Sequence, residues 1–95
     1  MDEWITLQGH VASANENALV VRMSSGELVT VENRPWRFAQ EQGFLAAVGD
    51  EVALTGFYEG EEFETGQLAN ITTNLVIEIR QENGRPLWAG GGRQG

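Results

Sequence analysis

The chain has 95 residues, the size of one small domain, and 41% of them are hydrophobic, which is too many for a disordered chain. The formal net charge is -8, all six basic residues are arginine, and there is no cysteine. Disulfides and cysteine-ligated metals are therefore excluded, and the charge argues against a protein that binds nucleic acid through general phosphate contacts.

Composition says little about the compartment. No apolar run approaches the roughly 20 residues that a membrane span requires. The acidic start, Met-Asp-Glu-Trp, lacks the positively charged region of a signal peptide. The absence of cysteine does not identify a compartment.

The first third of the chain predicts three strands. Residues 4–12 alternate between apolar and polar side chains and predict the first, bent at Gly9. After a polar turn, residues 18–23 and 27–31 predict the second and third. The tight turn Ser24-Ser25-Gly26 joins these two strands as a hairpin.

Residues 33–43 break the alternation and predict a helix of about two turns between clear start and stop signals. Pro35 suits the first turn of a helix, and Arg34, the residue before it, is disfavoured in the α region, so we expect the helix to start there. Gly43 suits the position just after the helix. The side chains expected to face the interior are Trp36, Phe38 and Ala39.

The stretch from Val48 to Gly60 organises the predicted fold. Gly49-Asp50 is a turn signal. The strand that follows presents one apolar face, through Val52, Leu54 and Phe57. Gly56 within this fourth strand predicts a bulge or sharp bend, which a strand needs in order to coil around a small core.

Two more strands follow the acidic hairpin tip at Gly60. Residues 63–71 predict a fifth strand with a further bend at Gly66, and residues 75–80 predict a sixth with one apolar side. Asn83-Gly84 is a strong hairpin signal, so residues 85–88 are expected to fold back on the sixth strand. Residues 89–95 are glycine-rich and are expected to form a flexible tail.

These elements predict a mainly β fold with a short helix between the third and fourth strands. A helix at that place in a five-stranded Greek-key barrel is the plan of the OB fold. We therefore expect residues 1–88 to form a single five- to six-stranded OB-fold-like barrel, closed around its core, with the helix sealing its lower opening. A six-stranded SH3-like barrel is the alternative, although a helix at this position is less expected there.

Three stretches carry a resemblance to a known group: G-D-E-V-A-L-T-G-F-Y-E, E-F-E-T-G-Q-L-A-N and E-N-G-R-P-L-W-A-G. Together they resemble small bacterial OB-like domains of uncharacterised function, over nearly the whole chain from Gly9 to Gly92. The resemblance implies a compact OB-like module of the kind often carried in exported or anchored proteins, and so an extracytoplasmic setting. It implies no catalytic residues.

Little in the chain indicates catalysis or metal binding. His10 is the single histidine and has no recognisable nucleophile partner, so a surface or barrel-mouth position is favoured over a general base. Acidic residues crowd the hairpin at Glu59, Glu61, Glu62 and Glu64, but their spacing does not match an EF-hand loop. We expect a solvated acidic tip with no tight calcium site, and no cofactor.

Two segments combine arginine, proline and tryptophan, at residues 34–38 and 85–88. OB domains bind single-stranded nucleic acid by stacking bases on aromatic side chains in a basic groove, which these segments could supply. The favoured interpretation is that Trp36 and Trp88 plug the two ends of the barrel, because burying an aromatic side chain stabilises a small core by about 2–3 kcal/mol. If a binding face exists, its expected residues are Trp36, Arg37, Tyr58, Arg85 and Trp88.

The function favoured by the sequence is a non-enzymatic binding or interaction module. Its partner would be another protein or the rest of a longer parent chain. A single-stranded nucleic-acid-binding OB domain is the alternative, supported by fold analogy and the arginine and tryptophan pairs. An enzyme is the least favoured class, because one histidine and no cysteine leave no recognisable nucleophile arrangement.

Overall fold

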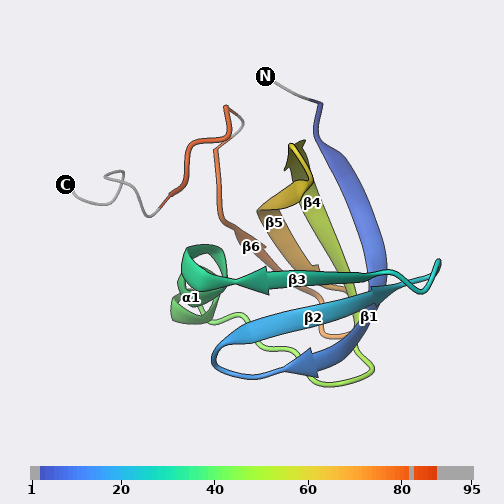
Figure 1. Cartoon of the computed structure of the whole chain (residues 1–95). Coiled ribbons are helices and arrows are strands. Elements are labelled where there is room, and N and C mark those ends of the chain that lie inside the picture. The colour runs from blue at the N-terminus through green and yellow to red at the C-terminus, as the bar shows by residue number, and fades with distance from the viewer. Residues whose placement is uncertain (1–2, 82, 88–95) are drawn as a thin grey trace.

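The computed structural model describes residues 3–81 and 83–87, and in these ranges the chain forms six strands and one helix (Figure 1). In chain order the elements are β1 (Ile5–Ala14), β2 (Ala18–Met23), β3 (Leu28–Glu32), α1 (Asn33–Glu41), β4 (Glu51–Glu59), β5 (Glu62–Asn70) and β6 (Leu75–Glu78). The predicted order of strands and helix is confirmed. The tail expected at residues 89–95 and the side chain of Trp88 lie outside the described residues.

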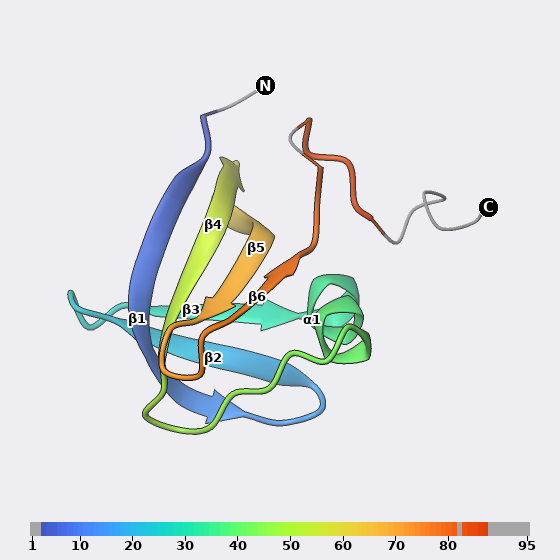
Figure 2. The ribbon, with the colours of Figure 1, turned by 180° about the vertical axis from the view of Figure 1, so that it is seen from behind.

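The strands form one antiparallel sheet in the order β3-β2-β1-β4-β5-β6, and this sheet curls strongly into a half-barrel (Figures 1 and 2). The curl depends on β1, because its first half, Ile5 to His10, pairs with β4 while Gly9 to Ala14 pairs with β2. Within the described ranges no pairing joins the edge strands β3 and β6. The expected closed cylinder is therefore open along one side.

Glycine permits the close strand contacts that this curl requires. The β4–β5 register shifts between Thr55 and Gly56, so that Gly66 is the extra residue on β5. A Cβ atom on Gly56 would collide with the carbonyl oxygen of Glu64, and one on Gly66 would collide with the ring of Trp4. The bends predicted at these two glycines are confirmed. In β1 the register shift falls between Val11 and Ser13, beyond the expected Gly9, while Gly9 is packed against the backbone of Arg22.

The core lies on the concave face of the sheet. Val52 and Leu54 of the organising strand are fully buried, as their alternation predicts. The remaining buried apolar side chains come from every layer of the fold and are Val11, Leu19, Val21, Met23, Val31, Trp36, Ala39, Phe44, Leu68 and Ile79. A small domain depends on such a cluster, because burial of each large side chain stabilises it by about 1.5–3 kcal/mol.

The helix α1 follows β3 directly and lies on the open side of the half-barrel, between the end of β3 and β6 (Figures 1 and 2). Trp36 and Ala39 are its buried residues, and Gly43 follows it with φ 97. The expected start was wrong, because Asn33 with φ 60 begins the helix and Arg34 is helical. Pro35 still fits, since the first four N–H groups of a helix have no partner within it.

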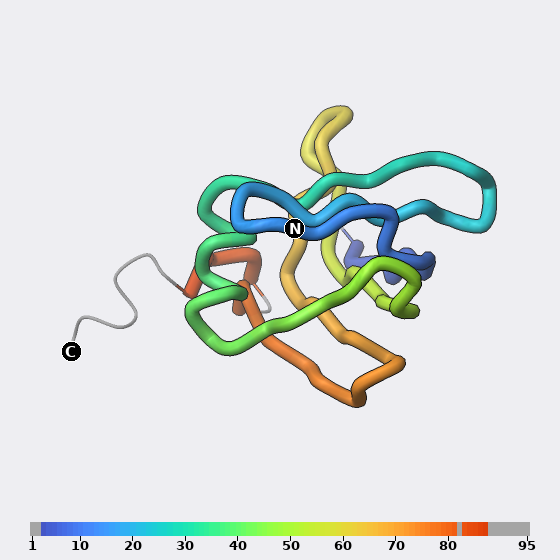
Figure 3. The backbone as a smooth tube through the Cα atoms, turned by 90° about the horizontal axis from the view of Figure 1, so that it is seen from below, coloured from blue at the N-terminus to red at the C-terminus, as the bar shows by residue number. Residues whose placement is uncertain are grey.

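The lower end of the half-barrel is crossed by the connection between α1 and β4, and not by the helix that was expected to seal it (Figure 3). Asn70, a buried residue of β5, fixes this connection, because its Nδ2 donates to the carbonyl oxygen of Leu45 at 3.0 Å and to Oδ2 of Asp50 at 2.9 Å. The Asn70 hydrogen bond and a second from the Ala47 backbone N–H hold the pKa of Asp50 below its usual value.

The chain after β6 turns back at Asn83-Gly84, as the hairpin signal predicts. The N–H of Gln81 donates to the carbonyl oxygen of Arg85 at 2.8 Å, and Arg80 forms an isolated bridge with Pro86. The Arg80 side chain anchors the return, because it donates to the carbonyl oxygens of Thr65 and Gly84 and pairs with Glu64 at 3.0 Å.

Candidate functional site

A cleft of about 360 Å³ remains on the open side of the half-barrel. One wall is the edge strand β3 with the residues at its two ends, and the other is the tip of the β4–β5 hairpin. The lining residues are 27–33, Pro35, Tyr58 and 61–65. This is the acidic cleft, and α1 bounds it through Asn33 and Pro35.

The floor of the acidic cleft is apolar at the hairpin. Tyr58 and Phe63 face each other across the β4–β5 pair, with ring centroids 5.2 Å apart in an edge-to-face arrangement. Tyr58 keeps 41% of its surface exposed, whereas Phe63 and Val29 are half-buried against the core. An aromatic side chain with one exposed face is suited to contact an apolar or cationic group of a ligand.

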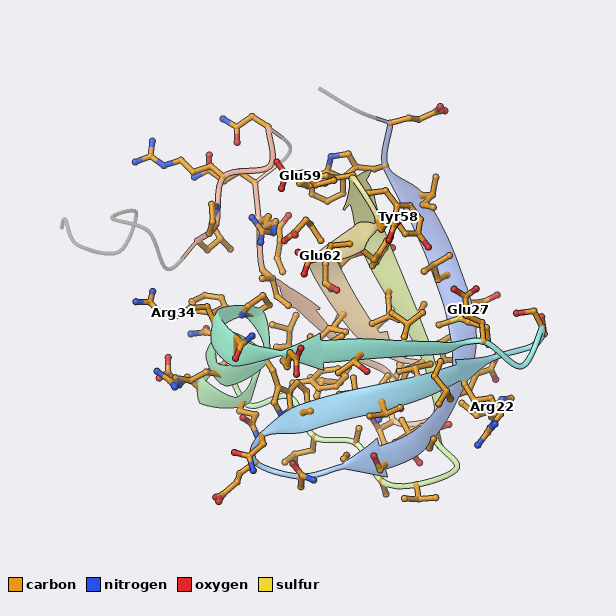
Figure 4. All side chains as sticks on the ribbon, viewed as in Figure 1. Arg22, Glu27, Arg34, Tyr58, Glu59 and Glu62 are labelled. Carbon is orange, nitrogen blue, oxygen red and sulfur yellow. The ribbon has the colours of Figure 1, made fainter. Side chains whose placement is uncertain are left out.

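Carboxylates surround this floor. Among the residues that the structure describes, no arginine lines the cleft, whereas five glutamates do: Glu27, Glu32, Glu61, Glu62 and Glu64. Glu64 is paired with Arg80, and the structure shows no ion pair within the described ranges for the other four. Figure 4 shows Glu27, Tyr58 and Glu62 around the space between β3 and the hairpin, with Arg34 beyond the far end of β3. The cleft is therefore strongly negative.

The β3 wall presents unpaired backbone groups to the cleft. The N–H of Met23 donates to the carbonyl oxygen of Glu27 at 2.8 Å, which fixes the bonded positions of the β2–β3 ladder. Because bonded and non-bonded pairs alternate in an antiparallel ladder, Val29 and Val31 bond to β2. The N–H and C=O groups of Leu28 and Thr30 therefore point away from β2, along the free edge. Glu32 adds its N–H there, because its C=O accepts the first hydrogen bond of α1.

The hairpin wall has an unpaired position as well. Glu59 and Glu62 flank its two-residue turn, so the next pair, Tyr58 with Phe63, is a non-bonded pair of the ladder. The backbone groups of Phe63 consequently point away from β4. β6 pairs with β5 only from Gln67 to Asn70, so it does not cover this part of β5.

The residues expected to form a binding face lie in different places. Tyr58 lines the acidic cleft, whereas Arg37 lines a separate depression on α1 with Arg34, Phe38 and Glu41. Trp36 is buried, and its indole N–H donates to the carbonyl oxygen of Asn15 at 2.8 Å. Arg85 is exposed in the C-terminal return, and Trp88 lies outside the described residues. Of the four that the structure describes, Tyr58 alone lines the acidic cleft.

Sequence reasoning missed the β3 wall. It placed the acidic residues of the hairpin at a solvated tip, yet Glu27 and Glu32 come from the two ends of β3 and meet them only through the curl of the sheet. The available signal was the alternation along β3, whose outer face exposes Leu28, Thr30 and Glu32. A short strand with one exposed face is typical of a sheet edge.

Other possible sites offer less. His10 is exposed and lines a wider hollow of about 640 Å³ with Arg22 and Glu51, and the described residues of this hollow form no cluster of charge of one sign. In the two described ranges no three histidine, aspartate or glutamate side chains are grouped to hold a metal ion. Within the same part of the chain, no helix is long and apolar enough to cross a membrane. Comparisons with protein-family models, curated proteins and solved structures found no match.

Proposed function

We propose that this chain is a non-enzymatic interaction module of the OB-like kind, which binds a polypeptide segment of another protein, or of a longer parent chain, in the acidic cleft. The spatial order β4-β1-β2-β3 supports the Greek-key assignment, because the fourth strand returns beside the first. The helix between β3 and β4 supports the OB-like plan, as does the resemblance to small bacterial OB-like domains. Carriage in an exported or anchored protein is part of that resemblance.

The observation that carries the proposal is the lining of the acidic cleft. It combines an exposed tyrosine, an open strand edge and five glutamates, with no arginine from the described part of the chain. A nucleic-acid strand would bring phosphates next to these carboxylates and lose the counterion-release term that drives such binding. A polypeptide can instead use the strand edge for backbone hydrogen bonds and the tyrosine for side-chain contact.

The test is to probe labelled protein against arrayed unstructured peptides of varied charge and, in parallel, against a labelled thymidine oligonucleotide at low salt. We expect saturable binding of a subset of the peptides and none of the oligonucleotide. Saturable oligonucleotide binding that weakens steeply with salt would support the nucleic-acid alternative. Binding of neither class would overturn the proposal.

A further inference from the structure

We propose that the acidic cleft takes a basic, extended segment as an added strand along β3, a strand that bridges the gap between β3 and β5. The inference rests on the proposed function and specifies the partner's chemistry and its mode of binding. Three observations carry it: the free backbone groups on both walls, the alternation of inward and outward side chains, and the sign of the charge.

The backbone groups define where the added strand would bond. Leu28 and Thr30 each turn an N–H and a C=O group out along the free edge of β3, and Glu32, whose C=O caps α1, adds its N–H. Phe63 turns the same groups away from β4 on the opposite wall. An extended segment in the cleft can thus form backbone hydrogen bonds along both of its own edges, to β3 on one side and to Phe63 on the other, as a strand inside a sheet does.

The side-chain pattern defines what the segment should contain. Val29 of β3 and Phe63 of the hairpin lie on the inner face and pack against the core cluster, and the ring of Tyr58 packs on that of Phe63. Glu32 and Glu62 occupy alternate positions, on the outer face of their strands. An added strand that alternates apolar and basic residues therefore packs its apolar side chains inward and brings its arginines between the outer carboxylates.

Charge selects this occupant over a second copy of the chain. Antiparallel pairing of two β3 edges would bring the acidic clefts of two protomers together, and each protomer carries a net charge of -8. Like charges opposite each other on paired strands are destabilising. A basic segment instead meets four carboxylates that have no ion pair in the described part of the chain.

The edge of β3 can be tested with a proline substitution. Thr30→Pro removes an N–H that points out of the sheet, so the β2–β3 ladder keeps its bonds. Thr30→Ala is the matched control, because it removes the same side chain and keeps the N–H. The probe is a fluorescein-labelled octapeptide of alternating arginine and valine, with an alternating glutamate and valine peptide as its charge control, and binding is measured by anisotropy.

We expect the basic peptide to bind and the acidic peptide not to bind. Thr30→Pro should weaken binding of the basic peptide about five- to tenfold, as expected for one or two lost hydrogen bonds, whereas Thr30→Ala should change it less than about twofold. Equal affinity of the Thr30→Pro and Thr30→Ala variants would overturn strand addition at β3. Melting curves of both variants show whether the proline has affected folding.

A second pair of variants keeps the inference testable if Thr30→Pro fails to fold. Glu32→Gln combined with Glu62→Gln removes two exposed charges of the cleft, and Glu16→Gln, in the exposed β1–β2 turn, is the control. We expect the double variant to bind the basic peptide about tenfold or more weakly than the wild type at low salt, and the control variant to bind it with unchanged affinity. If peptides bind regardless of charge and the double variant has no effect, the basic-segment inference fails while the proposed function stands.

Discussion

Asn70 donates a hydrogen bond from its side-chain amide to Oδ2 of Asp50, across 2.9 Å. The same amide nitrogen donates to the carbonyl oxygen of Leu45, and its oxygen accepts from the N–H of Thr73. One buried side chain therefore ties β5 to both the α1–β4 connection and the β5–β6 turn. These hydrogen bonds hold the lower end of the half-barrel together.

Asn70→Ala should therefore destabilise the fold by about 2–4 kcal/mol, because it leaves buried polar partners unsatisfied and removes packing volume. Asn17→Ala, in the exposed β1–β2 turn, is the control and should cost less than about 0.5 kcal/mol. Chemical denaturation of both variants measures the difference. A loss no larger than that of the control would contradict the role of Asn70.

The stability of the fold should depend on pH through Asp50. Its pKa is lowered in the folded chain, first by the Asn70 hydrogen bond and then by that of the Ala47 backbone. A carboxylate of this kind contributes stability above its unfolded pKa of about 3.9 and loses that contribution as the pH falls from there through the folded pKa. Acid should therefore weaken the α1–β4 connection.

Asp50→Asn isolates the contribution of Asp50 to acid sensitivity. The amide oxygen of asparagine can still accept hydrogen bonds, but it is not protonated between pH about 5 and pH about 3. We expect the denaturation midpoint of the variant to fall less steeply than that of the wild type between pH about 5 and pH about 3. Glu16→Gln should leave the wild-type slope unchanged. Identical pH profiles for Asp50→Asn and the wild type would remove Asp50 as a source of acid sensitivity.

Gly56 should tolerate no side chain. A Cβ atom there would meet the carbonyl of Glu64 on the neighbouring strand, so the β4–β5 ladder must shift to admit it. Gly56→Ala should cost more than about 2 kcal/mol. Gly26→Ala is the comparison, because Gly26 has φ 93 with no atom near its Cβ position, and left-handed strain alone costs about 1–2 kcal/mol. Thermal unfolding measures the loss of stability in each variant. A larger loss for Gly56→Ala indicates the collision, and equal losses for the two variants would argue against it.

Trp36 should stabilise the fold through the hydrogen bond of its indole N–H as well as through burial of its ring. Its indole N–H donates to the Asn15 carbonyl oxygen at 2.8 Å, whereas the amide of Gln40 reaches the same oxygen at 3.4 Å. Trp36→Phe keeps an aromatic ring but removes the donor, and should cost about 1–2 kcal/mol. Gln40→Ala should cost less than about 0.5 kcal/mol, because that contact is longer and exposed. Denaturation curves measure both, and a neutral Trp36→Phe variant would show that burial alone matters.

The sequence predicted the elements well because their signals are local. The positive φ angles at Gly43, Gly49 and Gly60 fall where turn signals stand in the chain, and the alternation in β4 follows from strand geometry. The start of α1 was less predictable, because the preference of a residue before proline was overridden at Arg34. The direct continuation of β3 into the helix accounts for this, since Asn33 takes the left-handed conformation there.

The acidic cleft was not predictable in the same way. Its walls come from segments about 30 residues apart in the chain, and they meet only because β1 divides its pairing between β4 and β2. Trp36 is buried and has a structural partner in Asn15, in agreement with the interpretation that favoured burial over ligand stacking, and it therefore does not point to the cleft. Pattern reasoning finds buried faces well, but it does not reveal which exposed faces the fold brings together.

The pairing of β1 with β4 also has a kinetic consequence. The β2–β3 and β4–β5 hairpins join neighbouring segments, whereas Ile5 must find Gly56 across about half of the chain. Closing so long a loop carries an entropic penalty before any contact compensates for it. We therefore expect the hairpins to form early and their docking through β1 to limit the rate, with refolding on the scale of about milliseconds to seconds.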